Sequence, residues 1–216
     1  MRRKRKKGKF SNFEEWEPYY REILDYFSFD RAKDEEAALM LQTLLERDDL
    51  PVLESLIRDR QVTVCGNAPC LVDELHRLKG TVLAADAASL VLEEHGVLPD
   101  AIFTDLDGAT EMYEEMNENG VVLVVHAHGD NMPLLRYWVP RFRGPLVGTT
   151  QARPLEGIYN FGGFSDGDRP VFTAHALGAE EVTILGFDLD DVGVNPVKRG
   201  KLIWARKLLK LIGHEL

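Results

Sequence analysis

The sequence predicts an α/β protein of three layers, in which a mostly parallel sheet carries helices on both faces and follows a helical N-terminal segment. From residue 61 onwards, apolar runs rich in β-branched residues alternate with helical stretches. These runs are apolar throughout instead of alternating with polar residues, which is typical of strands buried on both faces. A chain of 216 residues suits one such domain with an appendage.

Residues 1–10 form a basic tail. Seven of the residues between 2 and 9 are Lys or Arg, and none is acidic. The formal net charge of the chain is −10, and the part outside this tail has 19 basic and 36 acidic residues, a net of −17. Such an acidic body is a poor binder of nucleic acid. We expect the tail to be a disordered solubilising arm, and contact with RNA or an acidic surface is the alternative.

Residues 11–60 are expected to be helical. Apolar residues at spacings of three and four indicate an amphipathic helix, with a stripe made of Phe13, Trp16, Tyr20, Ile23, Leu24 and Phe27. Asp30 is suited to cap a second helix, and Leu53, Leu56 and Ile57 indicate a short third one. We find no chemistry in this segment and interpret its aromatic residues as core or interface.

Residues 61–216 are expected to form the α/β domain. Six strands are centred on Val62–Cys65, Val82–Ala85, Ala101–Thr104, Val121–Val125, Leu146–Gly148 and Val182–Gly186. Helices are expected between most of them, at Leu71–Leu78, Ala87–His95, Pro133–Trp138 and Arg169–Leu177. Sheets of this kind bind their ligands outside the carboxyl ends of the strands.

Polar residues follow the strands at those ends. They are Gly66 and Asn67 after the first strand, Asp86 after the second, Asp105 and Asp107 after the third, His126, His128, Asp130 and Asn131 after the fourth, Thr149, Thr150 and Gln151 after the fifth, and Asp188, Asp190 and Asp191 after the last. Acidic residues therefore follow four of the six strands. We interpret this rim of the sheet as a site for a cation and phosphate groups.

Asp105 and Asp107 are the most informative of these residues. Residues i and i+2 of an extended segment point the same way, so both carboxylates are expected on one side of the strand end. Two neighbouring carboxylates repel each other unless a cation lies between them, and Mg²⁺ is usually held by one or two carboxylates together with substrate phosphates. The alternative is a simple Asp-x-Asp-Gly turn.

Other clusters have competing interpretations. Cys65 and Cys70 have an unusual spacing for zinc and lack a second pair, so buried thiols are favoured. His126-Ala-His128 has the spacing of metal ligands and, together with Asp130, could bind a transition metal, although polar contacts to a substrate are favoured. Asp86 is suited to a site or to a helix cap, or both. The glycine-rich stretch 160–168 precedes a helix N-terminus, where phosphate is favoured, but on its own it is a weak signal.

The composition indicates the cellular compartment of the protein. No apolar run approaches the roughly 20 residues that a membrane span needs, and the basic N-terminus has no apolar segment behind it. Two cysteines do not make a disulfide framework. We expect a cytoplasmic protein, and the sequence leaves a homo-oligomer open.

Several motifs, in order along the chain, resemble those of one family. They are Gly66-Asn-Ala-Pro-Cys-Leu, Ala84-Ala-Asp-Ala-Ala, Pro99-Asp-x-x-x-Thr-Asp-Leu-Asp-Gly, His126-Ala-His-Gly-Asp-Asn, Gly148-Thr-Thr-Gln, Asn160-Phe-Gly-Gly-Phe-Ser-Asp-Gly-Asp-Arg and Leu177-Gly-Ala-Glu-Glu-Val-Thr-Ile-Leu-Gly-Phe-Asp-Leu-Asp. Together they resemble the archaeal 6-hydroxymethyl-7,8-dihydropterin diphosphokinases of the MptE type. Relatives tend to read Gly-x-Gly-Pro-Ser-Leu in the first loop, where this chain has Ala68 and Cys70, so a hydroxyl is missing there.

The resemblance implies diphosphate transfer from ATP to the hydroxymethyl group of a reduced pterin with release of AMP, in methanopterin or folate biosynthesis. It implies Mg²⁺ on Asp105 and Asp107, with Asp86 as a third catalytic residue. The implied substrate or nucleotide contacts are Gly66, Asn67, His128, Asp130, Asn131, Thr149, Thr150, Gln151, Asn160, Gly162, Gly163, Ser165, Asp166, Asp168, Asp188 and Lys201. Asn160, Asp166 and Asp168 are the candidates for the pterin, because carboxylates accept hydrogen bonds from its amino and ring N–H groups.

Three alternatives stay open at this stage. The Ala-Asp and Asp-x-Asp elements also resemble thiamine pyrophosphokinases, which share the fold and type of reaction. A nucleotide-sugar-dependent transferase would also use an Asp-x-Asp metal site. The non-enzyme alternative is a binding protein whose basic tail contacts RNA.

Overall fold

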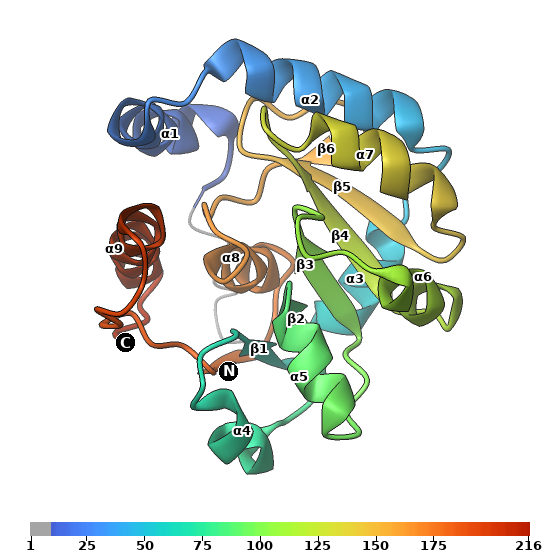
Figure 1. The fold of residues 1–216 in the computed structure, drawn as a ribbon, viewed down its shortest axis with the longest axis vertical. Helices are drawn as coiled ribbons and strands as arrows, with labels where there is room; N and C mark the ends of the chain where they lie inside the picture. The colour runs from blue at the N-terminus through green and yellow to red at the C-terminus, as the bar shows by residue number, and fades with distance from the viewer. Residues whose placement is uncertain (1–9) are drawn as a thin grey trace, which may run out of the picture.

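The computed structural model describes residues 10–216, and these form the predicted parallel sheet covered by helices on both faces (Figure 1). Seven strands lie in the order β6-β5-β4-β3-β2-β1-β7, and each neighbouring pair is parallel. The strands are β1 (Gln61–Cys65), β2 (Thr81–Ala85), β3 (Ala101–Thr104), β4 (Val122–Ala127), β5 (Leu146–Thr150), β6 (Ile158–Tyr159) and β7 (Glu181–Leu185). All carboxyl ends therefore meet along one edge.

The α-helices in the described part of the chain are α1 (Phe13–Phe27), α2 (Arg31–Leu44), α3 (Leu50–Ile57), α4 (Leu71–Glu74), α5 (Ala88–Glu94), α6 (Glu111–Glu118), α7 (Met132–Trp138), α8 (Asp168–Ala176) and α9 (Pro196–Leu211). Short 3-10 turns at Leu75–Arg77 and Val139–Arg141 extend α4 and α7. Figure 1 shows α6 and α7 on one side of the sheet and α8 on the other, with α9 beyond it.

Each face of the sheet has its own apolar core. One core joins the strands to α2, α5, α6 and α7, through residues such as Leu41, Leu92 and Trp138. The other joins them to α3, α8 and α9, through residues such as Ile57 and Val171. This arrangement explains why the strand sequences are continuously apolar, since side chains on both faces are buried.

The N-terminal helices follow the predicted pattern. Asn12 caps α1 by accepting a hydrogen bond from the backbone N–H of Glu15, and Asp30 caps α2 by accepting from Ala32. The apolar stripe of α1 does not reach the sheet. It packs on α8 and α9, where Trp16 and Tyr20 join a third core with Phe172 and other residues.

The prediction for the basic tail falls on residues 1–9, which lie outside the described residues. Its last residue, Phe10, is described and belongs to the folded body. The ring of Phe10 lies 5.4 Å from that of Trp16 and stacks on Phe172 at 5.7 Å, measured between centroids. Phe10 thus packs against α1 and α8.

Some element boundaries also differ from the sequence prediction. Strand β4 runs to Ala127 and β5 to Thr150, so His126, Thr149 and Thr150 lie in strands and not after them. The two-residue strand β6 and helix α6 were not predicted, because two residues carry no periodicity and α6 is rich in charged and polar residues. Among the described residues, no helix combines the length and apolar character that a membrane crossing requires.

Candidate functional site

Four carboxylates gather at the carboxyl edge of the sheet, and we call Asp86, Asp105, Asp107 and Asp166 the acid cluster. Asp86 follows β2, Asp105 and Asp107 follow β3, and Asp166 precedes α8. Each influences the ionisation of at least one other member. The sequence prediction had named all four, and the parallel strand order explains why they meet.

Asp86 is held in place by two hydroxyl groups. It adopts a left-handed backbone conformation, with φ of 43°, at the end of β2. The hydroxyl groups of Thr104 and Tyr113 donate to its Oδ1 at 2.7 and 3.2 Å. Burial, and next the Asp166 charge, raise the pKa of Asp86 to about 6. Its side chain does not cap α5, whose N-cap is Ala87 without a side-chain bond, so the alternative of a helix cap is wrong.

Asp105 and Asp107 are brought together by a tight turn. Leu106 between them has φ of 72°, a strained conformation for a residue with a side chain. The backbone N–H of Asp107 donates to Asp105 Oδ1 at 3.2 Å. The segment is thus a turn as well as a pair of neighbouring carboxylates, so the two interpretations of Asp-x-Asp-Gly are compatible.

The two carboxyl groups differ in ionisation. Burial alone would raise the pKa of Asp105, but the His128 hydrogen bond and the Arg169 charge hold it well below its usual range. Partial burial and the adjacent Asp105 charge raise the pKa of Asp107 to about 6, although its exposed side chain is screened by solvent. Asp107 therefore resists ionisation beside Asp105, and a bound divalent cation would relieve that repulsion.

His128 faces the acid cluster from the loop after β4. Its Nδ1 accepts from the backbone N–H of Asp130 at 3.3 Å, so in the neutral ring the proton lies on Nε2. That Nε2 lies 3.5 Å from Asp105 Oδ2. Asn131 fixes the loop by donating to the carbonyl groups of Asp105 and His126, both at 2.7 Å. Asn131 is buried by these contacts, while Asp130 is exposed.

His126 points to a different neighbour. Its Nδ1 lies 3.1 Å from Thr149 Oγ1, and that hydroxyl donates to the carbonyl of Val125. The imidazole must then donate through Nδ1, which leaves Nε2 as an acceptor. Burial, and next the Arg169 charge, hold the pKa of His126 well below 6.5, so the ring is neutral.

His126 and Arg169 line a small cavity beside the acid cluster. Phe103, Phe161 and Thr173 form another part of its wall. Arg169 donates through its two terminal nitrogens to Asp166 Oδ1 at 2.8 Å and to the carbonyl of Phe164 at 2.6 Å. Its Nε and the Nε2 of His126 are buried without a hydrogen-bond partner. Arg169 Nε is a donor and His126 Nε2 is an acceptor. The two atoms together therefore suit a ligand group that can both accept and donate a hydrogen bond.

The glycine-rich loop before α8 uses most of its polar groups internally. Asp168 is fully buried and accepts from the backbone N–H groups of Phe164 and Ser165 and from the Ser165 hydroxyl. Asn160 donates to the carbonyl groups of Gln151 and Ala152. The contacts of Asp168 and Asn160 shape the loop and do not leave them turned toward a ligand. Asp166 is the member of this loop that joins the acid cluster.

Close packing explains the two adjacent glycines of this loop. Gly162 and Gly163 both have positive φ, of 86° and 85°. A Cβ on Gly163 would lie 2.8 Å from the Cα of Arg169, and one on Gly162 would lie 2.7 Å from the ring of Phe10. Glycine therefore lets this loop fit against the start of α8 and the N-terminal segment.

The remaining predicted contacts are distributed along the same edge. Gly66 lies against Gly186, since a Cβ there would be 2.6 Å from the Gly186 carbonyl. Asn67 and Asp188 are exposed, whereas Thr150 and Gln151 are buried. Burial raises the pKa of Asp107 and of Asp166, and the charge of Lys201 in α9 partly opposes that rise, which places a cation beside the acid cluster.

Several residues of the site were not among the predicted contacts. Tyr113, Thr104 and Arg169 hold members of the acid cluster, and His126 was expected to make polar contacts to a substrate, with metal binding as the lesser alternative. Arg169 ends the motif Ser165-Asp-Gly-Asp-Arg, and a lone arginine among carboxylates was the signal that could have identified it. Tyr113 lies in a helix that carried no recognisable signal.

Two alternative metal sites receive no support. The described part of the chain contains no group of three His, Cys, Asp or Glu side chains placed to hold a metal ion. Neither the set His126, His128 and Asp130 nor the two cysteines form such a group in the described residues. Burial raises the pKa of the Cys65 thiol to about 12, as expected of a structural thiol. Mg²⁺ needs only one or two protein carboxylates, so the Asp105 and Asp107 pair still fits it.

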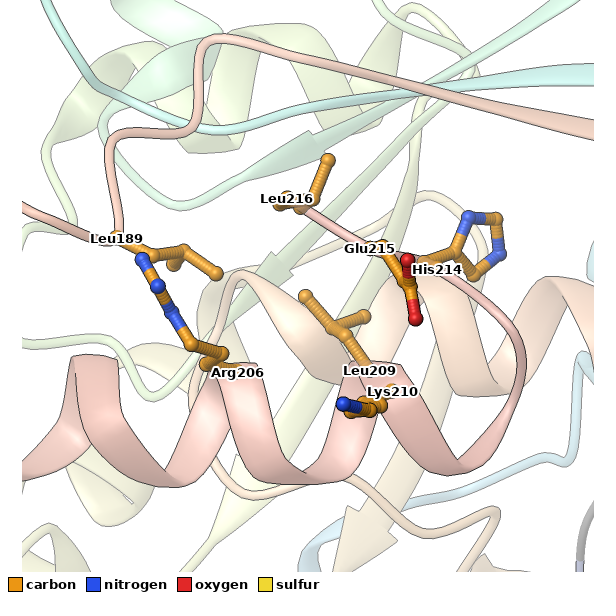
Figure 2. Close-up of a pocket in the computed structure, with 7 residues that line it drawn as sticks. All are labelled: Leu189, Arg206, Leu209, Lys210, His214, Glu215 and Leu216. Carbon is orange, nitrogen blue, oxygen red and sulfur yellow. The ribbon is translucent and has the colours of Figure 1, made fainter.

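A separate pocket lies against α9 and the C-terminal residues (Figure 2). Its lining residues are Leu189, Arg206, Leu209, Lys210, His214, Glu215 and Leu216. None of them belongs to the acid cluster or to the predicted site.

The fold and this edge define a parallel α/β protein with a carboxylate-rich site at the ends of its central strands. More particularly, the chain belongs to the MptE-like family, described as 6-hydroxymethylpterin diphosphokinase MptE-like, whose model matches residues 38–193. The whole acid cluster lies within the matched residues.

Three archaeal relatives carry the name 6-hydroxymethyl-7,8-dihydropterin pyrophosphokinase. The protein of Methanothermobacter thermautotrophicus is 42% identical over 214 residues, which cover 90% of this chain and 92% of the relative. Those of Pyrococcus furiosus and Methanocaldococcus jannaschii are 41% and 32% identical, over 83% and 95% of this chain and 79% and 97% of their own. Among solved structures, the MAf glycosyltransferase of Magnetospirillum magneticum AMB-1 matches with 17% identity and a TM-score of 0.47, over 78% of this chain and 29% of that one.

Proposed function

We propose that this protein is a 6-hydroxymethyl-7,8-dihydropterin diphosphokinase that uses ATP and Mg²⁺. The observation that carries the proposal is the acid cluster at the carboxyl edge, in a chain that is 42% identical to a relative named for this activity. In the reaction, the hydroxymethyl oxygen of the pterin attacks the β-phosphorus of ATP. The bond from that phosphorus to the oxygen shared with the α-phosphate breaks, AMP leaves, and the hydroxyl proton is released.

Asp105 and Asp107 are the residues that would hold Mg²⁺. Their carboxyl groups are adjacent, and Asp107 ionises reluctantly without a compensating cation. When bound, Mg²⁺ would neutralise charge on the phosphate oxygens, which is the main catalytic requirement of phosphoryl transfer. His128 would keep the Asp105 carboxylate oriented, because its Nε2 proton faces Oδ2.

Asp86 is suited to accept the proton of the hydroxymethyl group. A general base works best when its pKa lies near the working pH, and the pKa of Asp86 is raised to about 6. Its Oδ1 is occupied by Thr104 and Tyr113, whereas Oδ2 lies toward Gly108 and the turn that carries the Asp pair. Oδ2 is therefore the oxygen available for the proton.

Lys201 and Arg169 are the cations suited to the phosphates. An acidic protein needs such groups, because the triphosphate of ATP is repelled by unpaired carboxylates. Lys201 lies beside Asp107 and Asp166, since its positive charge opposes the rise in the pKa of both carboxyl groups. Arg169 is tethered by Asp166 and cannot move freely, so it would act as a fixed positive charge.

The pterin contacts need revision from the sequence hypothesis. Asn160 is occupied by the carbonyl groups of Gln151 and Ala152, and Asp168 is occupied within its own loop, so Asp166 is the remaining carboxylate of that set. The unpartnered Nε of Arg169 and Nε2 of His126 are a second donor and acceptor nearby. A reduced pterin has several donors and acceptors, and leaving any of them unpaired weakens binding.

An ATP assay with a panel of acceptors tests the proposal. Purified protein would be incubated with ATP and Mg²⁺ and either 6-hydroxymethyl-7,8-dihydropterin or thiamine, and AMP would be quantified by chromatography. A nucleotide-sugar in place of ATP completes the panel. We expect AMP only with the pterin, and none when EDTA replaces Mg²⁺. AMP release with thiamine at an equal or higher rate would contradict the assignment.

A further inference from the structure

Trp16 and Asp34 of the N-terminal helices contact loops of the site, and Tyr20 donates a hydrogen bond to Asp34; we call these three residues the N-terminal clamp. Trp16 and Tyr20 lie on α1 and Asp34 lies on α2. All three precede residue 38, where the match to the family model begins. The three side chains therefore lie outside the matched residues, although their partners Gly129 and Gln151 lie within two of the family motifs.

Asp34 is the centre of the clamp. It is buried, with 3% of its surface exposed, and accepts three hydrogen bonds. The backbone N–H of Gly129 donates to Oδ1 at 2.9 Å, and Tyr20 and Gln151 donate to Oδ2, both at 2.8 Å. Gly129 follows His128 in the loop after β4, and Gln151 follows β5. One carboxylate thus connects α1, α2 and two adjacent loops at the carboxyl edge.

Two further observations support a fixed contact at this point. A Cβ on Gly129 would lie 2.6 Å from the Cβ of Lys33, so the loop lies directly against α2. The indole N–H of Trp16 donates to the carbonyl of Gln151 at 2.9 Å, which fixes the second loop independently of Asp34. Figure 1 shows α2 next to α7, which follows the Gly129 loop, and next to β5, which precedes the Gln151 loop.

We propose that Asp34 is a positioning residue for the reaction, acting through Gly129 on His128. The Gly129 N–H fixes the backbone next to His128, and His128 in turn faces Asp105, the proposed Mg²⁺ ligand. Loss of the Asp34 contact should let the His128 ring move from Asp105 and weaken Mg²⁺ binding there. This inference rests on the proposed function for its kinetic part, but the contact itself is testable without activity.

The chain offers a matched control for Asp34. Asn117 is fully buried, donates to the carbonyl groups of Val121 and Pro145, and accepts from the backbone N–H of Gly144. It too makes three hydrogen bonds, but at the opposite, amino edge of the sheet. D34A and N117A therefore remove comparable buried networks, and only the first touches the site.

The conservative variant D34N serves as a rescue. The backbone N–H of Gly129 can only donate, and the Asn Oδ1 can still accept from it. The Tyr20 hydroxyl and the Gln151 amide can both reverse their roles and accept from the new amide group. We therefore expect D34N to retain the Gly129 contact that D34A loses.

The first test is hydrogen exchange of the Gly129 amide in the wild type, D34A, D34N and N117A. We expect fast exchange of this amide in D34A alone. The second test is the Mg²⁺ concentration that gives half-maximal AMP release. We expect an increase of about tenfold in D34A, as is usual when a group that supports a metal ligand is lost, little change in D34N, and no change in N117A.

Other outcomes would overturn the inference. Unchanged exchange at Gly129 in D34A would mean that Asp34 does not hold the loop. An equal rise in the half-maximal Mg²⁺ concentration in D34A and N117A would mean that Asp34 only stabilises the fold. If D34A does not fold, G129A disturbs the same contact from the loop side and should give the same kinetic change. If the wild type itself releases no AMP, the proposed function fails, and the exchange experiment still decides the contact.

Discussion

Asp86 should make the protein less stable at neutral pH than it would be with an uncharged side chain. The isosteric substitution Asp86→Asn keeps an acceptor for the hydroxyl groups of Thr104 and Tyr113 and removes the charge. In the unfolded chain the carboxyl has its ordinary pKa of 3.8, whereas in the folded protein the pKa is about 6. The folded state therefore holds its proton more tightly.

The sign of the effect follows from proton binding. Below pH about 4, Asp86 is protonated in both states and contributes no difference. Between about pH 4 and 6, the unfolded chain has lost the proton and the folded protein keeps it, so stability falls as the pH rises. Above about pH 6 the folded protein has lost this proton as well, and the loss of stability is complete. The rise in pKa corresponds to about 3 kcal/mol, and partial solvent screening reduces the expected value to about 1–2 kcal/mol.

Urea unfolding of the wild type and Asp86→Asn in EDTA, between pH 4.5 and 7.5, measures this difference. We expect Asp86→Asn to be the more stable protein at pH 7.5 by about 1–2 kcal/mol, and the gain to shrink toward pH 4.5. Asp25→Asn, at an exposed position on α1, is the control and should change stability by less than about 0.5 kcal/mol at every pH. An Asp86→Asn protein that is less stable at pH 7.5, or equally shifted at every pH, would refute the reasoning. The same variant should lose turnover, since it lacks the proposed base.

Three further results are expected. Asp105→Asn and Asp107→Asn should each abolish Mg²⁺-dependent AMP release and leave circular dichroism unchanged, and full activity in both would show that the pair is only a turn. Asp168→Ala should lower the free energy of unfolding by about 3 kcal/mol or more, because one buried and one partly buried backbone N–H group lose their acceptor, and a loss below about 1 kcal/mol in urea titrations would contradict this. Deletion of residues 2–9 should leave turnover almost unchanged, and a marked rise in the KM for ATP would mean that the tail supplies phosphate-binding cations.

The fold was predictable because its signals are local. The apolar runs at Ala101–Thr104 and its neighbours identify strands, and parallel order places their carboxyl ends together. From that alone, Asp86, Asp105 and Asp107 were expected at one edge. The strained backbone at Asp86 and Leu106, which aims the carboxylates, has no equivalent signal in the sequence.

The roles of individual polar residues were much harder to foresee. Asp168 and Asp166 are two residues apart in one polar loop, yet Asp168 is enclosed by its own loop and Asp166 joins the acid cluster. Hydrogen bonds of Asp34 cross 95 and 117 residues of the chain. Such contacts depend on how α2 packs on the sheet, and the spacing of residues in the sequence does not predict that packing.

Transfer of labelled phosphate tests the central claim most directly. The protein would be incubated with Mg²⁺, 6-hydroxymethyl-7,8-dihydropterin and ATP carrying ³²P in its β-phosphate, and the products would be separated by chromatography. Diphosphate transfer moves the β-phosphate to the pterin, so we expect the label in a pterin diphosphate and unlabelled AMP in equal amount. Label that remains in ADP, or that is released as free phosphate or diphosphate with no labelled pterin, would contradict the claim.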